Sequence, residues 1–331
     1  MKTNVRCTAW VFCAFLLSQA GISAAAPEFS PNAKLLPEYV PQALLETIEL
    51  ARTRGDRIWK GYGSERFGFL LVEPGQETLL CDPRLPDGFK RVADEPLLRC
   101  EQAIGPSSWR QTSFLAAMPV FGPPSLIVMG TPEATGRTMG EWKMTILHEH
   151  FHQWQSNQKD YYKRVEAMDL SGGDQTGMWM VNYPFPYSSA AVAALHSKAA
   201  FALRKAILAK KGRELTAANI LYLQTRRDLQ ASVSEKDWRY FEFQLWQEGV
   251  ARWTEIEIAS RSRNAEVRAS ALAARKKTLD DLAAPDLKGD GRVAVYAFGA
   301  GEAMLLERVA PNWRQCYLQN LSLGPRFEKQ C

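Results

Sequence analysis

Residues 138–159 read TMGEWKMTILHEHFHQWQSNQK, and this stretch predicts a long helix around which the fold is organised. Thr138 and Glu141 form a T-x-x-E capping box, which places the helix N-cap at Thr138. Four apolar residues then recur at helical spacing: Met144, Leu147, Phe151 and Trp154. We expect this apolar stripe to pack against a core.

Three of the chain's four histidines lie within five consecutive residues of this stretch. His148, Glu149 and His152 fit the H-E-x-x-H pattern. On a helix, the pattern places two imidazoles one turn apart on one face, at a spacing that suits zinc, beside a carboxylate that can act as a base. His150 points roughly to the opposite side. We interpret it as a surface histidine, or as one behind the ligands, rather than as a ligand.

Residues 1–26 have the organisation of a secretory signal peptide. Lys2 and Arg6 form a basic region, residues 9–17 are a short apolar run, and residues 23–26 supply small side chains for cleavage. No later run approaches the roughly 18 apolar residues that a membrane-spanning helix needs. We therefore expect an exported protein, periplasmic or secreted, with no membrane anchor and a mature part at 27–331.

The four cysteines outside the signal peptide fit an oxidising compartment, because an even number can pair completely. Three connectivities are possible for these residues, Cys81, Cys100, Cys316 and Cys331. The local pairing Cys81–Cys100 with Cys316–Cys331 is favoured, since each bridge closes a short loop. The alternative of a cysteine metal site is disfavoured, because no C-x-x-C spacing occurs.

Composition gives no reason to expect a nucleic-acid partner. Without Lys2 and Arg6, the 41 basic residues become 39 against 36 acidic ones, a net charge of about +3. The densest basic stretch, 204–213, reads as the solvated face and end of a helix, since no aromatic residues are interleaved. The mature length suits one large domain or two small ones.

The order of predicted elements indicates an α+β fold with a small mixed sheet first and helices after it. Residues 27–41 are proline-spaced and read as extended. Strands are predicted at 67–72, 77–81 and 125–129, the first two joined across Pro74-Gly75 by a loop longer than that of a tight hairpin. Helices are predicted near 42–54, 189–211, 216–230, 235–260, 265–282 and 292–309. The mixed part is expected to end at about 160, with the helical part at 161–331.

A zinc site of this kind needs a third protein ligand, and residues 246–255, WQEGVARWTE, offer Glu248. The alternative is that Glu248 is an ordinary helix residue paired with Arg252 at i,i+4. The weaker ligand candidates are Glu242, Glu255 and Glu257. Glu255 lies two turns beyond Glu248 on the same face, a position from which it can orient a ligand histidine.

Together, His148-Glu149-x-x-His152 and Glu248-Gly249-x-Ala251-x-Trp253 resemble the gluzincin zinc metallopeptidases. The second pattern is especially similar to the catalytic domain of the aminopeptidase N-like family. The resemblance implies a zincin-like fold and one Zn²⁺ held by His148, His152 and Glu248. It also implies that Glu149 is the catalytic base.

A further segment, Tyr296-Ala297-Phe298-Gly299, looks like the Y-x-x-G segment of the same family. The resemblance implies that Tyr296 stabilises the tetrahedral intermediate. Alternatively, Tyr296 is an ordinary core tyrosine. Gly249 and Gly299 can likewise serve only to permit close helix packing. The family's G-x-M-E-N segment, which binds a free amino terminus, has no match, and Glu248 follows His152 by 96 residues (248 − 152). Zinc chemistry is therefore better supported than aminopeptidase specificity.

The resulting hypothesis is an exported zinc metallopeptidase that cleaves a peptide or protein substrate with metal-activated water, Glu149 acting as general base. One alternative is a zinc hydrolase of a non-peptide amide or ester, because the same metal chemistry serves both. Another is a non-catalytic exported protein that keeps zinc for structure or partner binding. The aromatic loop 183–187 either lines a substrate cleft or plugs the core, and His196 reads as structural or exposed. The oligomeric state is left open.

Overall fold

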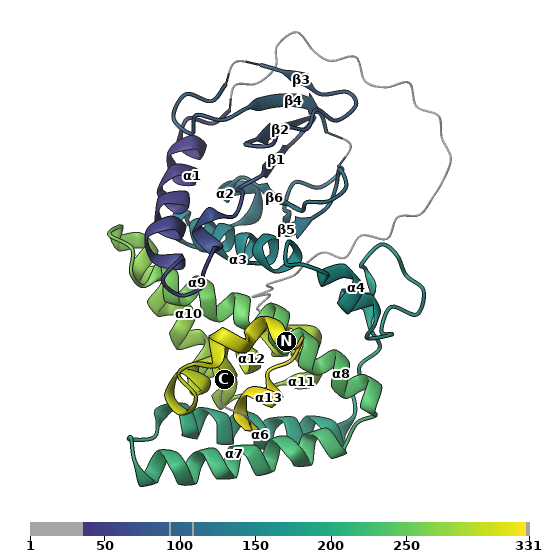
Figure 1. Cartoon of the computed structure of the whole chain (residues 1–331), viewed down its shortest axis with the longest axis vertical. Helices are drawn as coiled ribbons and strands as arrows, with labels where there is room; N and C mark the ends of the chain where they lie inside the picture. The colour runs from purple at the N-terminus through teal and green to yellow at the C-terminus, as the bar shows by residue number, and fades with distance from the viewer. Residues whose placement is uncertain (1–35, 93, 108, 329–331) are drawn as a thin grey trace, which may run out of the picture.

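The computed structural model describes residues 36–92, 94–107 and 109–328, so the predicted signal peptide and Cys331 lie outside the described residues. A six-stranded sheet forms in the first part of the chain and helices follow it (Figure 1). The α+β prediction, with the sheet first, is confirmed. No helix of the described ranges is long and apolar enough to cross a bilayer.

The sheet is mixed and has the strand order β3-β4-β2-β1-β6-β5. Only the β1–β6 pairing is parallel among its neighbouring strands. The strands are β1 (Phe69–Glu73), β2 (Gln76–Leu80), β3 (Lys90–Arg91), β4 (Gln102–Pro106), β5 (Leu115–Met118) and β6 (Leu126–Gly130). The three predicted strands correspond to β1, β2 and β6, whereas β3, β4 and β5 were not predicted.

The connection between β1 and β2 is a tight hairpin, so the predicted longer loop is wrong. Glu73 pairs with Gln76, which leaves only Pro74 and Gly75 in the turn. Gly75 has a φ of +78°, a backbone conformation open to glycine because it lacks a Cβ. Each strand runs one residue further into the turn than its apolar pattern indicates.

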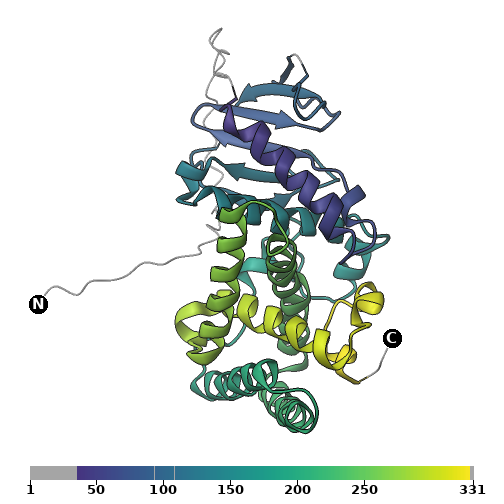
Figure 2. The same ribbon diagram turned by 90° about the vertical axis from the view of Figure 1, so that its left-hand side faces the viewer.

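The two faces of the sheet are buried against different partners. Alternate strand residues such as Phe69 and Leu71 face the main core, under α1 (Tyr39–Leu50) and α3 (Met139–Ser156). Figure 2 shows α1 running along this face. Leu70 and Val72 face a second, smaller core closed by partly buried aromatic residues of the loops. Helix α1 begins before Pro41, so the predicted extended stretch is wrong at 39–41. A proline is tolerated in a first helical turn, where its missing N–H would have no partner.

The helical part agrees closely with the predicted segments. It contains α6 (Ala190–Leu208), α7 (Arg213–Ala231), α8 (Glu235–Gln244), the π-turn η3 (Leu245–Gly249), α9 (Val250–Ala259), α10 (Ala265–Ala283) and α12 (Ala294–Val309). The predicted helix at 235–260 forms as one continuous helical run, in which the π-turn η3 lies between α8 and α9. Helices α6 and α7 form a hairpin at the end of the molecule opposite the sheet (Figure 1). Short helices fill the connections, among them α2 (Pro132–Thr135), α4 (Tyr161–Glu166), α5 (Trp179–Asn182), α11 (Leu287–Asp290) and α13 (Gly324–Glu328).

Helix α3 links the two parts, and its capping box is formed as predicted. The Thr138 N–H donates to Glu141 Oε2 at 3.0 Å, and the Glu141 N–H donates to Thr138 Oγ1 at 3.3 Å. The predicted apolar stripe of α3 is buried. The helix contacts β5 and β6 on one side and α9 and α10 on another, so its middle lies between the sheet and the helical part.

Two glycines bring η3 and α12 into backbone contact. A Cβ on Gly249 would lie 2.4 Å from Gly299 Cα, and one on Gly299 would lie 2.6 Å from the Leu245 carbonyl oxygen. No side chain fits at either position without moving backbone. The close-packing role of these glycines is confirmed, and it places the start of α12 directly beside Glu248.

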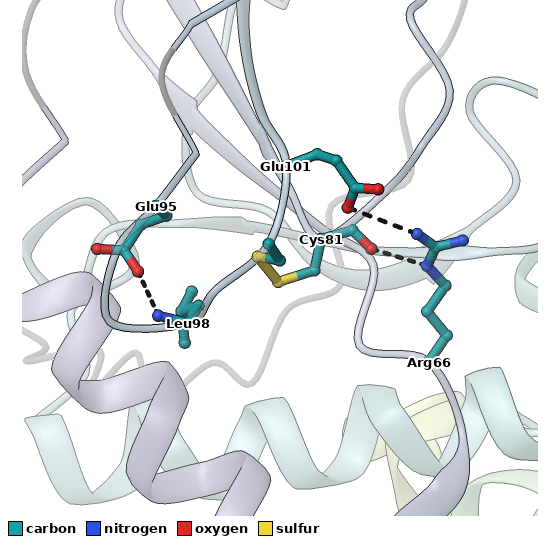
Figure 3. The surroundings of a disulfide bond; sticks show 6 residues. Arg66, Cys81, Glu95, Leu98 and Glu101 are labelled. Atoms are coloured by element: carbon teal, nitrogen blue, oxygen red, sulfur yellow. Dashed lines mark hydrogen bonds and ion pairs between the residues drawn. A yellow bond between two sulfur atoms is a disulfide. The ribbon is translucent and has the colours of Figure 1, made fainter.

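A disulfide joins Cys81, just after β2, to Cys100, just before β4, with a Cα–Cα distance of 4.9 Å. The predicted Cys81–Cys100 pairing is confirmed, whereas the partner predicted for Cys316 lies outside the described residues. Figure 3 shows Arg66 beside the bridge: its Nε donates to the Cys81 carbonyl oxygen at 2.8 Å, and its Nη2 lies 3.8 Å from Glu101 Oε2. The bridge therefore links β2 to β4, whereas α3 contacts β5 and β6 at the other end of the strand order.

Candidate metal centre

The three predicted ligands, His148, His152 and Glu248, form one compact group, a candidate metal-binding group. His148 and His152 of α3 and Glu248 of η3 each offer a ligand atom, and these atoms all lie within 4.8 Å of one another. Glu248 Oε2 lies 3.5 Å from His148 Nε2 and 3.3 Å from His152 Nε2. The two Nε2 atoms are 3.1 Å apart. The fold therefore brings together residues that are 96 positions apart in the chain.

The second ring nitrogen of each histidine, Nδ1, contacts a side chain outside the group. His148 Nδ1 lies 3.1 Å from Glu255 Oε2, and His152 Nδ1 lies 2.7 Å from Gln155 Oε1. Both partners are acceptors, so in the neutral rings Nδ1 carries the hydrogen and Nε2 turns a lone pair toward the centre of the group. This is the tautomer that metal binding requires.

The donor set fits a metal ion. Glu248 Oε2 is buried and has no hydrogen-bond partner among the described residues, and it faces two imidazole lone pairs. Converging lone pairs repel one another unless a cation lies between them. Two imidazole nitrogens and one carboxylate oxygen are the ligands of catalytic zinc sites, which keep a fourth position open. The group could hold a metal of this kind.

The electrostatics of His148 also favour a cation at this point. Burial lowers the pKa of His148, but the neighbouring carboxylates of Glu248 and Glu255 together outweigh burial and raise the pKa to about 10. A proton thus occupies the group readily when no metal does, and a bound metal ion would replace it.

Glu248 is tied to an arginine that the sequence did not single out. Arg292 Nη2 donates to Glu248 Oε1 at 2.6 Å. Burial alone would raise the pKa of Glu248, but Arg292 and His152 hold it well below its usual value, so the carboxylate is ionised. The alternative pairing of Glu248 with Arg252 is wrong, because Arg252 bonds to Glu255 instead.

Glu255 lies where a residue that orients a ligand must lie, between His148 and Arg252. Burial would raise its pKa, but Arg252 and His148 together outweigh burial and lower it, which keeps the carboxylate charged. The other weak ligand candidates bind elsewhere. Glu242 pairs with Arg226, and Glu257 pairs with two arginines on the surface of α9 and α10.

Glu149, the predicted base, lies beside the group and lines the same cavity. Its side chain is 1% exposed, and its Oε2 has no hydrogen-bond partner within the described ranges. Burial raises the pKa of Glu149, while the neighbouring His148 and His152 and the Ala117 N–H act in the opposite direction. A carboxylate with a raised pKa takes up protons more readily than one in water.

Tyr296, the predicted oxyanion donor, stacks on His148 with ring centroids 5.9 Å apart. Its hydroxyl oxygen accepts a hydrogen bond from Arg292 Nη1 at 3.3 Å. Burial, and then the nearby Glu248 carboxylate, raise the pKa of Tyr296 well above its usual value. The hydroxyl therefore keeps its proton and can donate it in a hydrogen bond.

A cavity of about 560 Å³ opens in front of the metal-binding group. Its walls come from β5, from Tyr161 and Tyr162 of α4, and from the segment 171–181, which includes Trp179. The aromatic loop 183–187 is not part of this lining. Phe185 packs in the core against Phe241 with ring centroids 5.5 Å apart, so the loop is a core plug.

His150 lies outside the metal-binding group, as predicted, but it is a core residue and the surface interpretation is wrong. It is 0% exposed and stacks on Phe67 with ring centroids 3.5 Å apart. Its ring nitrogens bond to Gln153 Oε1 and to the Tyr62 carbonyl oxygen. Burial lowers its pKa to about 4, so the ring is neutral.

Sequence reasoning missed Arg292 and Gln155, which hold the ligands from behind. One signal was present for each: Arg292 precedes Tyr296 by one helical turn, and Gln155 follows His152 by three residues. Neither spacing distinguishes such a contact from an ordinary surface residue.

No family model, curated protein or solved structure gives a significant match to this chain. The assignment of a function therefore rests on the residues and geometry of the site.

Proposed function

We propose that this protein is an exported zinc-dependent metallopeptidase of the gluzincin type, with a zincin-like fold. One observation carries the proposal: His148 Nε2, His152 Nε2 and Glu248 Oε2 converge on one point beside Glu149, within a single cavity. Three ligands leave a fourth position for chemistry, whereas structural zinc sites are usually closed by a fourth protein ligand. Within the described residues, the group contains three such ligands.

The roles of the side chains follow from their positions. Bound zinc would supply Lewis acidity at the cluster. Glu149 takes the proton of the water that attacks the substrate carbonyl and then delivers it to the leaving amine. Tyr296 donates its hydroxyl hydrogen to the oxygen on which negative charge develops. The buried setting strengthens both interactions, because little water screens them.

The edge of the sheet supports a peptide as the substrate. Ile127 of β6 donates its N–H toward β1, to the Gly68 carbonyl oxygen at 2.9 Å. Ala117 of β5 lies opposite Ile127, so its N–H and C=O groups point away from β6. Strand β5 is the last strand in the sheet order, and its outer edge faces Glu149 and the cavity. An extended peptide can add to such an edge through main-chain hydrogen bonds.

Export is part of the proposal and rests on the predicted signal peptide together with the Cys81–Cys100 bridge. Disulfides persist in oxidising compartments and are rare in the cytosol. A periplasmic or secreted location agrees with both observations.

The test measures metal content together with peptide cleavage. We expect one zinc per chain, activity on a peptide library that chelation removes, and a loss of about 10²–10⁴-fold in kcat for Glu149→Gln with zinc retained. Full activity of Glu149→Gln would refute the mechanism. A zinc-loaded protein that cleaves esters or non-peptide amides, but no peptide, would transfer the proposal to that class. A zinc-loaded protein without hydrolytic activity would favour a structural or partner-binding role.

A further inference from the structure

Arg292 donates hydrogen bonds from all three of its guanidinium nitrogens to residues at or behind the metal-binding group. Its Nη2 donates to Glu248 Oε1 at 2.6 Å, and its Nη1 donates to the Tyr296 hydroxyl at 3.3 Å. Its Nε donates to Gln244 Oε1 at 2.9 Å. Gln244 is 0% exposed, so the arginine is fixed against a rigid part of the core.

These contacts divide the two oxygens of Glu248 between two tasks. Oε1 accepts from Arg292, while Oε2 faces His148 and His152 and has no hydrogen-bond partner in the part of the chain that the structure describes. A carboxylate held in this way can offer a metal one oxygen. The π-turn η3 contributes, because it places Gln244 and Glu248 on the side that faces Arg292.

The charge of Arg292 acts against the affinity for a metal cation. A guanidinium is always charged, and this one is 12% exposed, so solvent screens it weakly. It repels a cation bound at the far oxygen of Glu248 and withdraws charge from that ligand. An arrangement built only to hold metal tightly would have a neutral or acidic group in this place.

We infer that Arg292 is a positioning residue that limits Glu248 to one metal-facing oxygen and links it to Tyr296, at a cost in metal affinity. The inference rests on the proposed metal site. Its catalytic part rests in addition on the proposed peptidase function. Because the same guanidinium contacts the ligand and the oxyanion donor, a change in one alters the position of the other.

The experiment uses the full mature chain and compares Arg292→Met with Arg292→Lys. For Arg292→Met we expect zinc affinity to rise about tenfold in competition with a chromophoric chelator, because the repelling charge is gone and both oxygens of Glu248 are available. The visible spectrum of the cobalt(II)-loaded variant should weaken, as expected for a higher coordination number. If the protein is a peptidase, kcat should fall about 10–100-fold with little change in KM.

Arg292→Lys separates charge from geometry, since lysine keeps the charge but lacks the planar fork. We expect its zinc affinity to stay within about threefold of wild type, while its cobalt spectrum changes. This variant also decides the question if Arg292→Met does not fold. Arg308→Met is the matched control: Arg308 lies near the end of α12, the helix that follows Arg292, and donates to backbone carbonyls at the end of α6 rather than to the metal-binding group.

The outcomes separate the two proposals. Equal or weaker zinc binding by Arg292→Met, with an unchanged cobalt spectrum, would overturn the role of Arg292 and leave the proposed function standing. In Arg292→Lys, an unchanged cobalt spectrum would have the same meaning. A wild-type protein that binds zinc but cleaves nothing would refute the proposed function, while the affinity measurement would still decide the role of Arg292. A wild-type protein that binds no metal would refute both.

Discussion

Glu255 Oε2 lies 3.1 Å from His148 Nδ1, on the side of the ring opposite the metal-facing nitrogen. The carboxylate thereby fixes both the rotation of the ring and the position of its hydrogen. Arg252 holds Glu255 in turn, so a chain of three side chains sets one ligand atom. His152 is held differently, through the neutral amide of Gln155. The two histidines therefore depend on partners of different charge.

From this relationship we predict that Glu255→Gln binds zinc about 10–100-fold more weakly than wild type, because the anionic acceptor behind His148 is lost. Chelator competition measures the effect, and circular dichroism checks that the fold is kept. Glu257→Gln is the control, since Glu257 lies on the same helix but pairs with the surface arginines Arg261 and Arg275. Equal zinc affinity in Glu255→Gln and wild type would show that Glu255 does not orient the ligand.

A second prediction concerns the contact between Gly249 and Gly299. Gly249→Ala would place a methyl group 2.4 Å from Gly299 Cα, so η3 and α12 must separate. We expect a loss of about 1–3 kcal/mol in the free energy of unfolding. We also expect weaker zinc binding, because Glu248 is the neighbour of Gly249 in the chain and moves with it.

Gly301→Ala is the control for this substitution and lies on the same helix as Gly299. Its methyl group would meet the ends of the Leu203 and Leu282 side chains at 2.9 Å and that of Ile207 at 3.4 Å, and these ends can move. Urea unfolding should show a smaller loss for Gly301→Ala and an unchanged zinc affinity. Equal effects of the two substitutions would argue against a special backbone contact at Gly249.

The helices could be predicted because their signals are local. Ser189 and Asn264 cap α6 and α10, and buried apolar residues repeat along α6 at the helical period. Strand β5 carries no such signal. Its sequence, Leu-Ala-Ala-Met, favours a helix by propensity, and it becomes a strand through its pairing with β6. Edge strands of this kind are set by tertiary contacts that a single sequence does not display.

The residues of the site can likewise be divided into those with a local sequence signal and those without one. His148, Glu149 and His152 share one helix, so their spacing alone predicts their common face. Glu248 was found through its neighbouring residues, and its position depends on the Gly249–Gly299 contact. Arg292 reaches Glu248 from another helix across 44 residues, and no periodicity encodes that contact. Local patterns identified the candidate ligands, whereas the groups that would orient them are fixed by packing.

The bridge between Cys81 and Cys100 should stabilise the sheet without affecting the metal-binding group. It closes a loop with a sequence separation of 19 residues, so its loss should lower the free energy of unfolding by about 3 kcal/mol in the loop-entropy model. We predict this loss for the double substitution Cys81→Ser with Cys100→Ser, measured by urea unfolding, with zinc affinity unchanged. A large fall in zinc affinity would mean that the β2–β4 part of the sheet and the metal-binding group are coupled.

The last prediction concerns His196, which lies in the core of the helical part and not on the surface. It is 3% exposed, packs against Phe298 with ring centroids 5.2 Å apart, and neither ring nitrogen has a hydrogen-bond partner among the described residues. Burial lowers its pKa from 6.5 to about 4. Below about pH 6.5, His196 therefore binds a proton in the unfolded chain but not in the folded chain. The free energy of unfolding falls as the pH falls.

Between pH 6.5 and about pH 4, this single group should remove about 3 kcal/mol from the free energy of unfolding. His196→Phe cannot take up the proton, so we expect its stability to depend less steeply on pH than that of wild type and to exceed it at acidic pH. Urea unfolding across this range measures the difference. The buried His150, whose pKa is lowered in the same way, keeps its own contribution in both proteins. Parallel pH profiles for wild type and His196→Phe would mean that His196 is accessible to protons in the folded chain.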